Sequence, residues 1–302
     1  MVRIGIDGAD TSHVRLFTEA FEHAGIARVS AIRGDNSIRT ASIIEAFAYE
    51  RALTLCDSDH PFVDTVDAVL LLSVDWNAHL DRALSYLARD KRVFIDKPVA
   101  GSFTDLIRLR ELVSNYPDKI FGGSALPHHP IFHEFLERFN FFAKNDPAEV
   151  EIFGSMDSYF MASHSYELAS AILGDVKDAV VHWSDHIKIH SAIGSHETTI
   201  SLRQAAAGAE HPWTIRARVG KQLLLCSFPL QGIYDGLLHA LNEHLVRGSR
   251  WSPGISIDLA LAAERSGHTG HPVSILELDL GDMIPSEAFL AEYRSRFGDK
   301  PL

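Results

Sequence analysis

The sequence predicts an α/β protein in which a Rossmann-type, doubly wound parallel sheet is followed by an α+β domain with a mostly antiparallel or mixed sheet. In the first 122 residues, short apolar segments alternate with segments of helical periodicity, as in a parallel sheet covered by helices. From residue 179 onward, strand-like segments follow one another, which is typical of an α+β domain. The length of 302 residues suits two domains. We therefore predict domains at 1–122 and 123–302.

Composition excludes several classes of protein. A hydrophobic content of 46% with 23% charged residues is that of an ordinary soluble globular chain. The formal net charge of −12 argues against nucleic acid or an anionic membrane as the main partner. Cys56 and Cys226 lie far apart in apolar segments, as reduced core cysteines do. With no leader-like start and no apolar run near 18 residues, we expect a cytoplasmic protein.

The first strand, at 2–6, runs into a turn and then a helix, the order found at the start of a dinucleotide-binding unit. If Gly8 is the first glycine of a G-x-G-x-x-G turn, Asp10 and His13 replace the second and third. The helix start can still hold a phosphate; alternatively, Asp10 or Thr11 only caps the helix. The cofactor-binding residues predicted in this turn are Gly8, Asp10, Thr11, Ser12 and His13.

The second strand, at 28–32, ends at Arg33, where an acidic residue would bind the ribose hydroxyls of NAD. A guanidinium there suits a 2′-phosphate, which favours NADP over NAD. Asp35 could still reach the ribose, or the segment could be a solvent-exposed turn. Arg33 is therefore a predicted cofactor-binding residue.

The next elements complete the parallel sheet. Strands are expected at 53–56, 67–73, 93–95 and 119–122, and helices at 38–51, from residue 79 to 88, and at 104–113. Pro98 cannot donate to a sheet and keeps Lys97 extended, so the strand at 93–95 ends with Lys97 pointing off its carboxyl end. Ligands of open α/β sheets bind at that edge. Ser73, Asp96 and Lys97 are therefore added to the cofactor-binding residues.

These features together resemble the Gfo/Idh/MocA oxidoreductase family. The resemblance rests on the strand-turn-helix start, on Asp67-Ala68-Val69 opening an apolar strand, on His79 at the next helix start, and on Asp96-Lys97-Pro98. The family usually has Glu-Lys-Pro, and Asp96 is a shorter acid in the same role. The resemblance covers nearly the whole chain, because the second half matches as well.

In the second half, the family places a D-x-G-x-H-x-x-D pattern at a helix start. His164 matches the histidine and Glu167 the final acid, whereas Phe160 and Ala162 replace the earlier aspartate and glycine. We expect a helix at 165–173, whose dipole would keep His164 neutral and available as a base. The alternative is a capping histidine without a chemical role.

The remaining segments complete the α+β domain. Helices are expected at 130–141, 233–246, 257–265 and 286–297, and strands at 179–183, 187–192, 198–203, 214–219 and 223–228. At 186–190, alternation puts His186, Lys188 and His190 on one face and both isoleucines on the other. A polar sheet face at a dimer interface or cleft is favoured over a metal site, because a lysine separates the histidines and no carboxylate or cysteine completes a ligand set. The resemblance implies a homo-oligomer, a dimer or tetramer, formed through the open face of this sheet.

The resemblance implies an NAD(P)-dependent oxidoreductase that transfers a hydride to or from a carbinol or carbonyl carbon of a sugar-like or cyclitol-like small molecule. Lys97 and His164 would be catalytic, and the substrate would contact Lys97, His164 and Glu167. Two alternatives stay open. One is a non-catalytic binding or regulatory homologue that lost the loop glycines. The other is a redox-neutral lyase or isomerase with a tightly held nicotinamide cofactor.

Overall fold

The computed structural model describes residues 1–25, 27–34, 38–57 and 59–302. Its first sheet has the order β3-β2-β1-β4-β5-β6, and every pair of neighbours is parallel. The strands are β1 (Val2–Asp7), β2 (Ala27–Arg33), β3 (Thr54–Leu55), β4 (Ala68–Leu71), β5 (Arg92–Asp96) and β6 (Ile120–Gly123). The strand order reverses between β1 and β4, which is the doubly wound arrangement that the sequence predicted.

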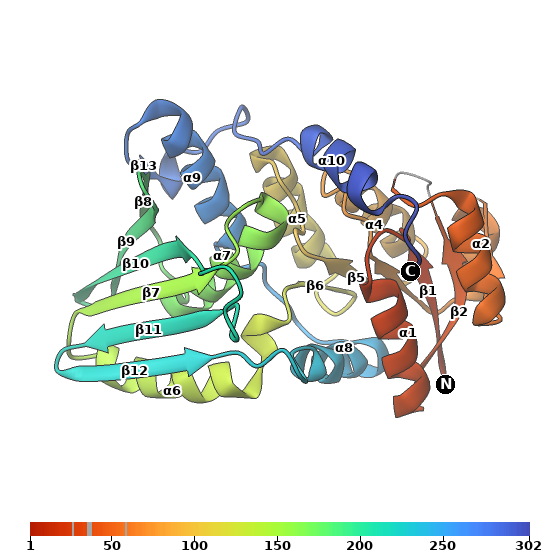
Figure 1. Ribbon diagram of the computed structural model, residues 1–302, viewed down its shortest axis with the longest axis horizontal. Helices are drawn as coiled ribbons and strands as arrows, with labels where there is room; N and C mark the ends of the chain where they lie inside the picture. Colours follow the sequence, from red (N-terminus) through yellow and green to blue (C-terminus); the bar gives the residue numbers. More distant parts are fainter. Residues whose placement is uncertain (26, 35–37, 58) are drawn as a thin grey trace.

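Helices cover both faces of this sheet (Figure 1). They are α1 (His13–Ala24), α2 (Ala41–Glu50), α3 (Asp59–Thr65), α4 (His79–Leu87) and α5 (Phe103–Asn115). The central strands consist of buried aliphatic residues because both of their faces are covered; Ile6, Val69 and Ile95, for example, are fully buried. The seven-residue helix α3 was not predicted, since it is too short for helical periodicity to be visible.

The second sheet has seven strands in the order β12-β11-β7-β10-β9-β8-β13. They are β7 (Ala148–Gly154), β8 (Val180–Trp183), β9 (Ile187–Ile193), β10 (His196–Gln204), β11 (Thr214–Val219), β12 (Gln222–Ser227) and β13 (Val273–Ser274). The pairing of β7 with β10 is parallel and the other pairings are antiparallel, so the sheet is mixed, as expected. The sequence analysis overlooked β7, although its Ala148, Val150 and Ile152 alternate with more exposed residues.

Helices pack against one face of the second sheet and leave the other open (Figure 1). They are α6 (Pro130–Ala143), α7 (Tyr159–Leu173) and α9 (Ser256–Thr269). Ile187 and Ile189 of β9 are buried and His190 is exposed, which confirms the predicted alternation. Leu223 and Leu225 of β12 are 58% and 63% exposed. The predicted oligomer through this sheet stays a prediction.

Two helices from the last third of the chain return to the first sheet. Helix α8 (Asp235–Arg247) buries Leu237 and Leu241 in the same core cluster as Phe17 and Phe94. Helix α10 (Glu287–Phe297) lies over the carboxyl ends of the first sheet's strands (Figure 1). Strand β6 extends one residue past the predicted boundary, to Gly123, and α8 and α10 from the second half cover the first sheet. The two domains at 1–122 and 123–302 stay a prediction.

Among the residues that the structure describes, no helix is both long enough and apolar enough to cross a bilayer. No group of three or more His, Cys, Asp or Glu side chains among them is placed to hold a metal ion.

Candidate functional site

The carboxyl ends of β1 and β4 meet at Gly8 and Ser73. Gly8 has φ +90°, and a Cβ at this position would lie 2.5 Å from the backbone N of Ser73. Only glycine permits this approach without strain. The Ser73 hydroxyl accepts a hydrogen bond from the Asp75 N–H, and its carbonyl accepts one from His79 Nε2, 2.9 Å away. The glycine is therefore required here by the fold, before any ligand is considered.

The Asp10 carboxylate of the predicted phosphate turn points into the protein and away from the start of α1. Asp10 is 1% exposed, and its Oδ2 accepts a hydrogen bond from the Val74 N–H at 3.0 Å. The Thr11 hydroxyl accepts one from the His13 N–H, while Ser12 is exposed at the N-cap of α1. The negative side chain that replaces the second glycine is therefore turned away from the helix N-terminus.

His13 does not face the turn but joins two elements of the site. Its Nδ1 lies 2.6 Å from Asp96 Oδ2, and its Nε2 lies 2.9 Å from the hydroxyl of Tyr234. Asp96 Oδ1 also accepts a hydrogen bond from the Lys97 N–H. Burial alone would raise the pKa of Asp96, but His13 and Lys97 together lower it. Tyr234 was not predicted, because nothing in the sequence links it to residues more than 130 positions away.

Lys97 is 3% exposed at the end of β5. Its Nζ donates a hydrogen bond to the Phe160 carbonyl at 3.2 Å, and it lies 3.2 Å from the centroid of the Phe160 ring. Burial lowers the pKa of Lys97 to about 8, although Asp96 and Glu167 oppose the shift. Phe160, at the position where the resemblance implies an aspartate, therefore contacts the ammonium with its ring and its carbonyl.

His164 is also buried, and its Nδ1 lies 2.6 Å from the Ser124 hydroxyl. Helix α7 begins at Tyr159, so the predicted start at residue 165 was wrong, and His164 lies in the second turn rather than at the first. The pKa of His164 is held well below its usual range chiefly by burial, and further by the charges of Lys97 and His13. His164 is thus neutral mainly because it is buried, and not because of the helix dipole.

Glu167 lies one turn after His164 and, like His164, binds Ser124. Its Oε2 accepts a hydrogen bond from the Ser124 N–H at 2.8 Å. Gly123, at φ +106°, makes room for it, since a Cβ there would lie 2.6 Å from Oε2. Burial raises the pKa of Glu167 to about 8. Ser124 thus connects His164 with Glu167, a link that no sequence motif indicated.

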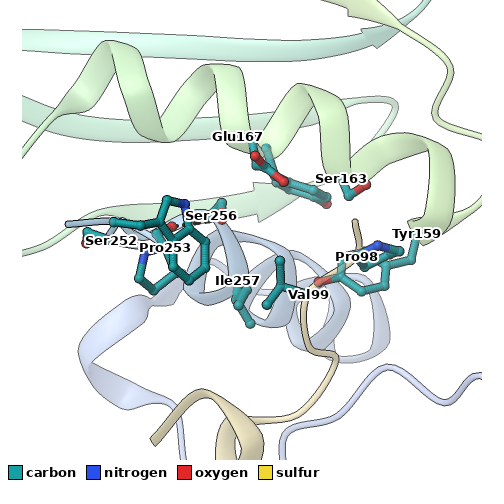
Figure 2. A pocket seen from close by; sticks show the side chains of 11 residues that line it. Pro98, Val99, Tyr159, Ser163, Glu167, Ser252, Pro253, Ser256 and Ile257 are labelled. Carbon is teal, nitrogen blue, oxygen red and sulfur yellow. Dashed lines mark hydrogen bonds between the residues drawn. The ribbon is translucent and has the colours of Figure 1, made fainter. Parts of the chain in front are cut away.

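A small cavity lies beside the Glu167 carboxyl group. Its volume of about 40 Å³ is enough for a water molecule. Figure 2 shows Glu167 and Ser163 on the α7 side of the cavity and Val99 on the opposite side. Glu167 is therefore accessible to water, whereas Lys97 and His164 do not line this cavity.

Arg33 binds a protein carboxylate at the end of β2. Its Nε and Nη2 donate to the two oxygens of Asp7 at 3.1 and 2.9 Å. Asp7 is fully buried and also accepts hydrogen bonds from Arg82 and Tyr86. Asp35, the alternative ribose contact, lies outside the described residues. A 2′-phosphate at Arg33 would therefore compete with Asp7.

The structure brings most of the predicted residues together at one edge. Lys97, His13 and His164 are close enough that the first two lower the pKa of the third. Arg33 is set apart by its bond to Asp7, and Ser73 binds the Asp75 N–H with its hydroxyl and His79 with its carbonyl. The residues that the sequence analysis missed here are Ser124, Trp213, Tyr234 and Arg39; the Trp213 ring lies edge-on to His164 at 4.9 Å.

No family model matches this sequence, and no curated protein matches it either. Solved structures do match in fold. A probable dehydrogenase from Thermotoga maritima has a TM-score of 0.74 and 16% identity, covering 92% of this chain and 100% of its own. A myo-inositol dehydrogenase from Lactobacillus casei, in complex with NAD(H) and myo-inositol, has a TM-score of 0.73 and 15% identity, covering 95% and 99%.

A myo-inositol dehydrogenase from Corynebacterium glutamicum has a TM-score of 0.73 at 14% identity, covering 91% of this chain and 98% of its own. At such low identity, these likenesses establish the arrangement of the elements and leave the chemistry to the site itself. The chain has the fold of the Gfo/Idh/MocA oxidoreductases.

Proposed function

We propose that the protein is an NAD(P)-dependent oxidoreductase that transfers a hydride to or from a carbinol or carbonyl carbon of a sugar-like or cyclitol-like molecule. The observation that carries the proposal is a buried pair at the carboxyl edge of the first sheet. Lys97 has a pKa lowered to about 8, and the neighbouring His164 is held neutral. Perturbed acid and base groups at such an edge are typical of catalytic sites. The likeness in fold to myo-inositol dehydrogenases supports the substrate class.

The residues of the first domain fit a dinucleotide. The turn after β1 has its Asp10 carboxylate turned inward, and exposed Ser12 begins α1, so an anion can approach the helix N-terminus. When bound, the cofactor supplies or takes up the hydride. Of the predicted cofactor contacts, we assign Thr11 and Ser12 to the pyrophosphate, and His13 and Asp96 to the positioning of Lys97.

The protein's own residues would handle the proton. Lys97, charged below its pKa of about 8, can donate a proton or a hydrogen bond to the substrate oxygen. His164 stays neutral at physiological pH and can accept the proton in the oxidative direction. Ser124 fixes the His164 ring through Nδ1 and holds Glu167 through its N–H. Glu167 would contact the substrate or exchange protons with water in the adjoining cavity.

Titration with NAD, NADH, NADP and NADPH is expected to show binding of at least one nicotinamide dinucleotide, measured by calorimetry or by quenching of tryptophan fluorescence. The reason is the strand order of the first sheet and the exposed Ser12 at the start of α1. No binding of any of the four at millimolar concentration, either by the wild type or by a variant that lacks the inner side chains of α10, would sink the oxidoreductase proposal.

We further propose a preference for NADP, carried by the position of Arg33 at the end of β2. The change Arg33→Ala should weaken NADPH binding more than NADH binding, because a guanidinium can pair with the 2′-phosphate bidentately. The comparison of the two dissociation constants is the measurement. Equal loss for both cofactors would mean that Arg33 serves only as a partner of Asp7.

A second candidate function is a non-catalytic binding or regulatory protein. This function is favoured by Phe160, which replaces the aspartate of the family pattern. The ring and the carbonyl of Phe160 both contact the Lys97 ammonium, which would otherwise face the substrate. A redox-neutral lyase or isomerase with a tightly held cofactor is the third. Binding of a dinucleotide separates the first two, and net consumption of added cofactor separates an oxidoreductase from the third.

A further inference from the structure

The segment that follows Pro285 lies on the edge of the first sheet where a dinucleotide would bind. Figure 1 shows α10 above α4 and the end of β5, with the chain then turning down toward the end of β1. The start of the segment is firmly attached. Trp76 Nε1 donates to the Ile284 carbonyl at 2.9 Å, and the Ser286 hydroxyl donates to Asp75. Both Ile284 and Ser286 are buried.

Beyond α10, the chain occupies the phosphate turn. Arg39 is 4% exposed, and its Nε donates to the carbonyl of Asp10, within the turn itself. Its Nη1 donates to the carbonyls of Lys300, at 2.6 Å, and of Phe297. Arg15 Nε, from α1, donates to the Leu302 carbonyl at 2.8 Å. A guanidinium beside a helix N-terminus is well suited to a phosphate, and here its donors bind backbone carbonyls of the protein's own chain.

Helix α10 also closes the catalytic end of the edge. The Phe289 ring stacks on Phe160 at 5.3 Å, and the Tyr293 ring lies 5.9 Å from it. Phe160 is the residue that contacts the Lys97 ammonium. The segment at 287–302 therefore touches both ends of the proposed cofactor site, the phosphate turn and, through Phe160, the lysine.

The inner face of α10 packs against the core, but its side chains are only partly buried. None of its side chains is fully buried, and its inner face consists of the half-buried Phe289, Leu290, Tyr293 and Phe297. A cavity of about 420 Å³ remains between this face and the start of α7. Few buried apolar contacts mean a low free energy of local opening. A fixed attachment at Ser286 followed by a partly buried helix is the arrangement expected of a hinged lid.

We propose that residues 287–302 form an autoinhibitory lid, which occupies the dinucleotide site and must swing away about Ser286 before the cofactor binds. The inference rests on the proposed function, because it names the nicotinamide dinucleotide as the ligand that competes with the lid. Arg39 changes partners in this transition, from the carbonyls of Phe297 and Lys300 to the phosphates of the cofactor. A lid that is open about one hundredth of the time weakens the apparent affinity about 100-fold.

The test uses the full chain with the inner face of the lid removed, as the triple variant Phe289→Ala, Tyr293→Ala and Phe297→Ala. Ser295→Ala, on the exposed face of the same helix, is the matched control. We expect the triple variant to bind NADH or NADPH at least about 10-fold more tightly than the wild type, and the control to bind as the wild type does. Circular dichroism checks that each variant is folded.

Hydrogen exchange on the wild type gives a second measurement that needs no variant. A saturating dinucleotide should speed exchange of the amides at 287–302 and leave 275–285, which precede the hinge, unchanged. Slower exchange at 287–302 with cofactor would mean that the helix closes over the ligand, and the lid would be overturned. Equal affinity in wild type and triple variant would overturn it too, while leaving the oxidoreductase proposal standing. Absence of binding in every variant would overturn both proposals.

Discussion

The change Lys97→Met is expected to lower turnover by about 10²-fold or more, the usual contribution of a positioned acid or base, while leaving cofactor affinity nearly intact. The ammonium is buried and lies at the end of β5, on the edge where ligands bind. Methionine keeps the apolar stem and most of the length but cannot donate a proton. Steady-state kinetics in both directions, with cofactor binding measured separately, is the experiment. A variant that turns over like the wild type would remove Lys97 from the chemistry.

The pH dependence follows from the same residue. Burial lowers the pKa of Lys97 to about 8, so the lysine is charged below pH 8 and neutral above it. If Lys97 is the donor, kcat/KM for reduction falls as the pH rises through about 8, whereas oxidation, which needs the proton acceptor, does not fall there. In Lys97→Met, the fall of kcat/KM for reduction near pH 8 should disappear. A profile that is the same in wild type and variant would assign the titration to another group.

The pairing of Lys97 with His164 predicts non-additive effects. Both side chains are buried at one site, and the charge of the first lowers the pKa of the second. If both act on one transferred proton, Lys97→Met combined with His164→Ala should cost little more than the worse single change. Independent, multiplying losses would mean that the two residues serve different steps.

The largest expected effect on stability comes from Asp7→Ala. Asp7 is fully buried and accepts hydrogen bonds from Arg33, Arg82 and Tyr86. Its removal leaves two guanidinium groups, 16% and 20% exposed, and a buried tyrosine hydroxyl without this acceptor. We expect the free energy of unfolding to fall by about 3 kcal/mol or more, as when one partner of a buried ion pair is removed. Urea denaturation at neutral pH measures it.

Asp81→Ala is the matched control, because it removes the same charge from α4 at a site where the carboxylate is 75% exposed. Its ion pair with Arg108 lies at the surface, so we expect a cost of about 1 kcal/mol or less. Similar losses in the two variants would show that the Asp7 cluster contributes no more than a surface pair.

The sequence by itself determined where the strands of the first sheet lie along the chain and where they end. Apolar runs such as the one at 68–71 must be covered on both faces, and glycines and prolines mark where each strand ends. Lys97 was placed at a strand end by Pro98 alone, and β5 indeed ends at Asp96. Local rules suffice at such positions because the cause lies within a few residues of the effect.

The tertiary structure decided what each of these residues contacts. Asp10 replaces the second glycine of the turn, but its carboxylate accepts a hydrogen bond from the Val74 N–H, and the Arg33 guanidinium binds Asp7. Ser124 and Tyr234 carry no motif, yet they hold His164 and His13. Such contacts join residues up to 221 positions apart, and periodicity and turn propensity reach only about one helical turn. The position of α10 over the phosphate turn has the same origin, since it depends on packing between the two ends of the chain.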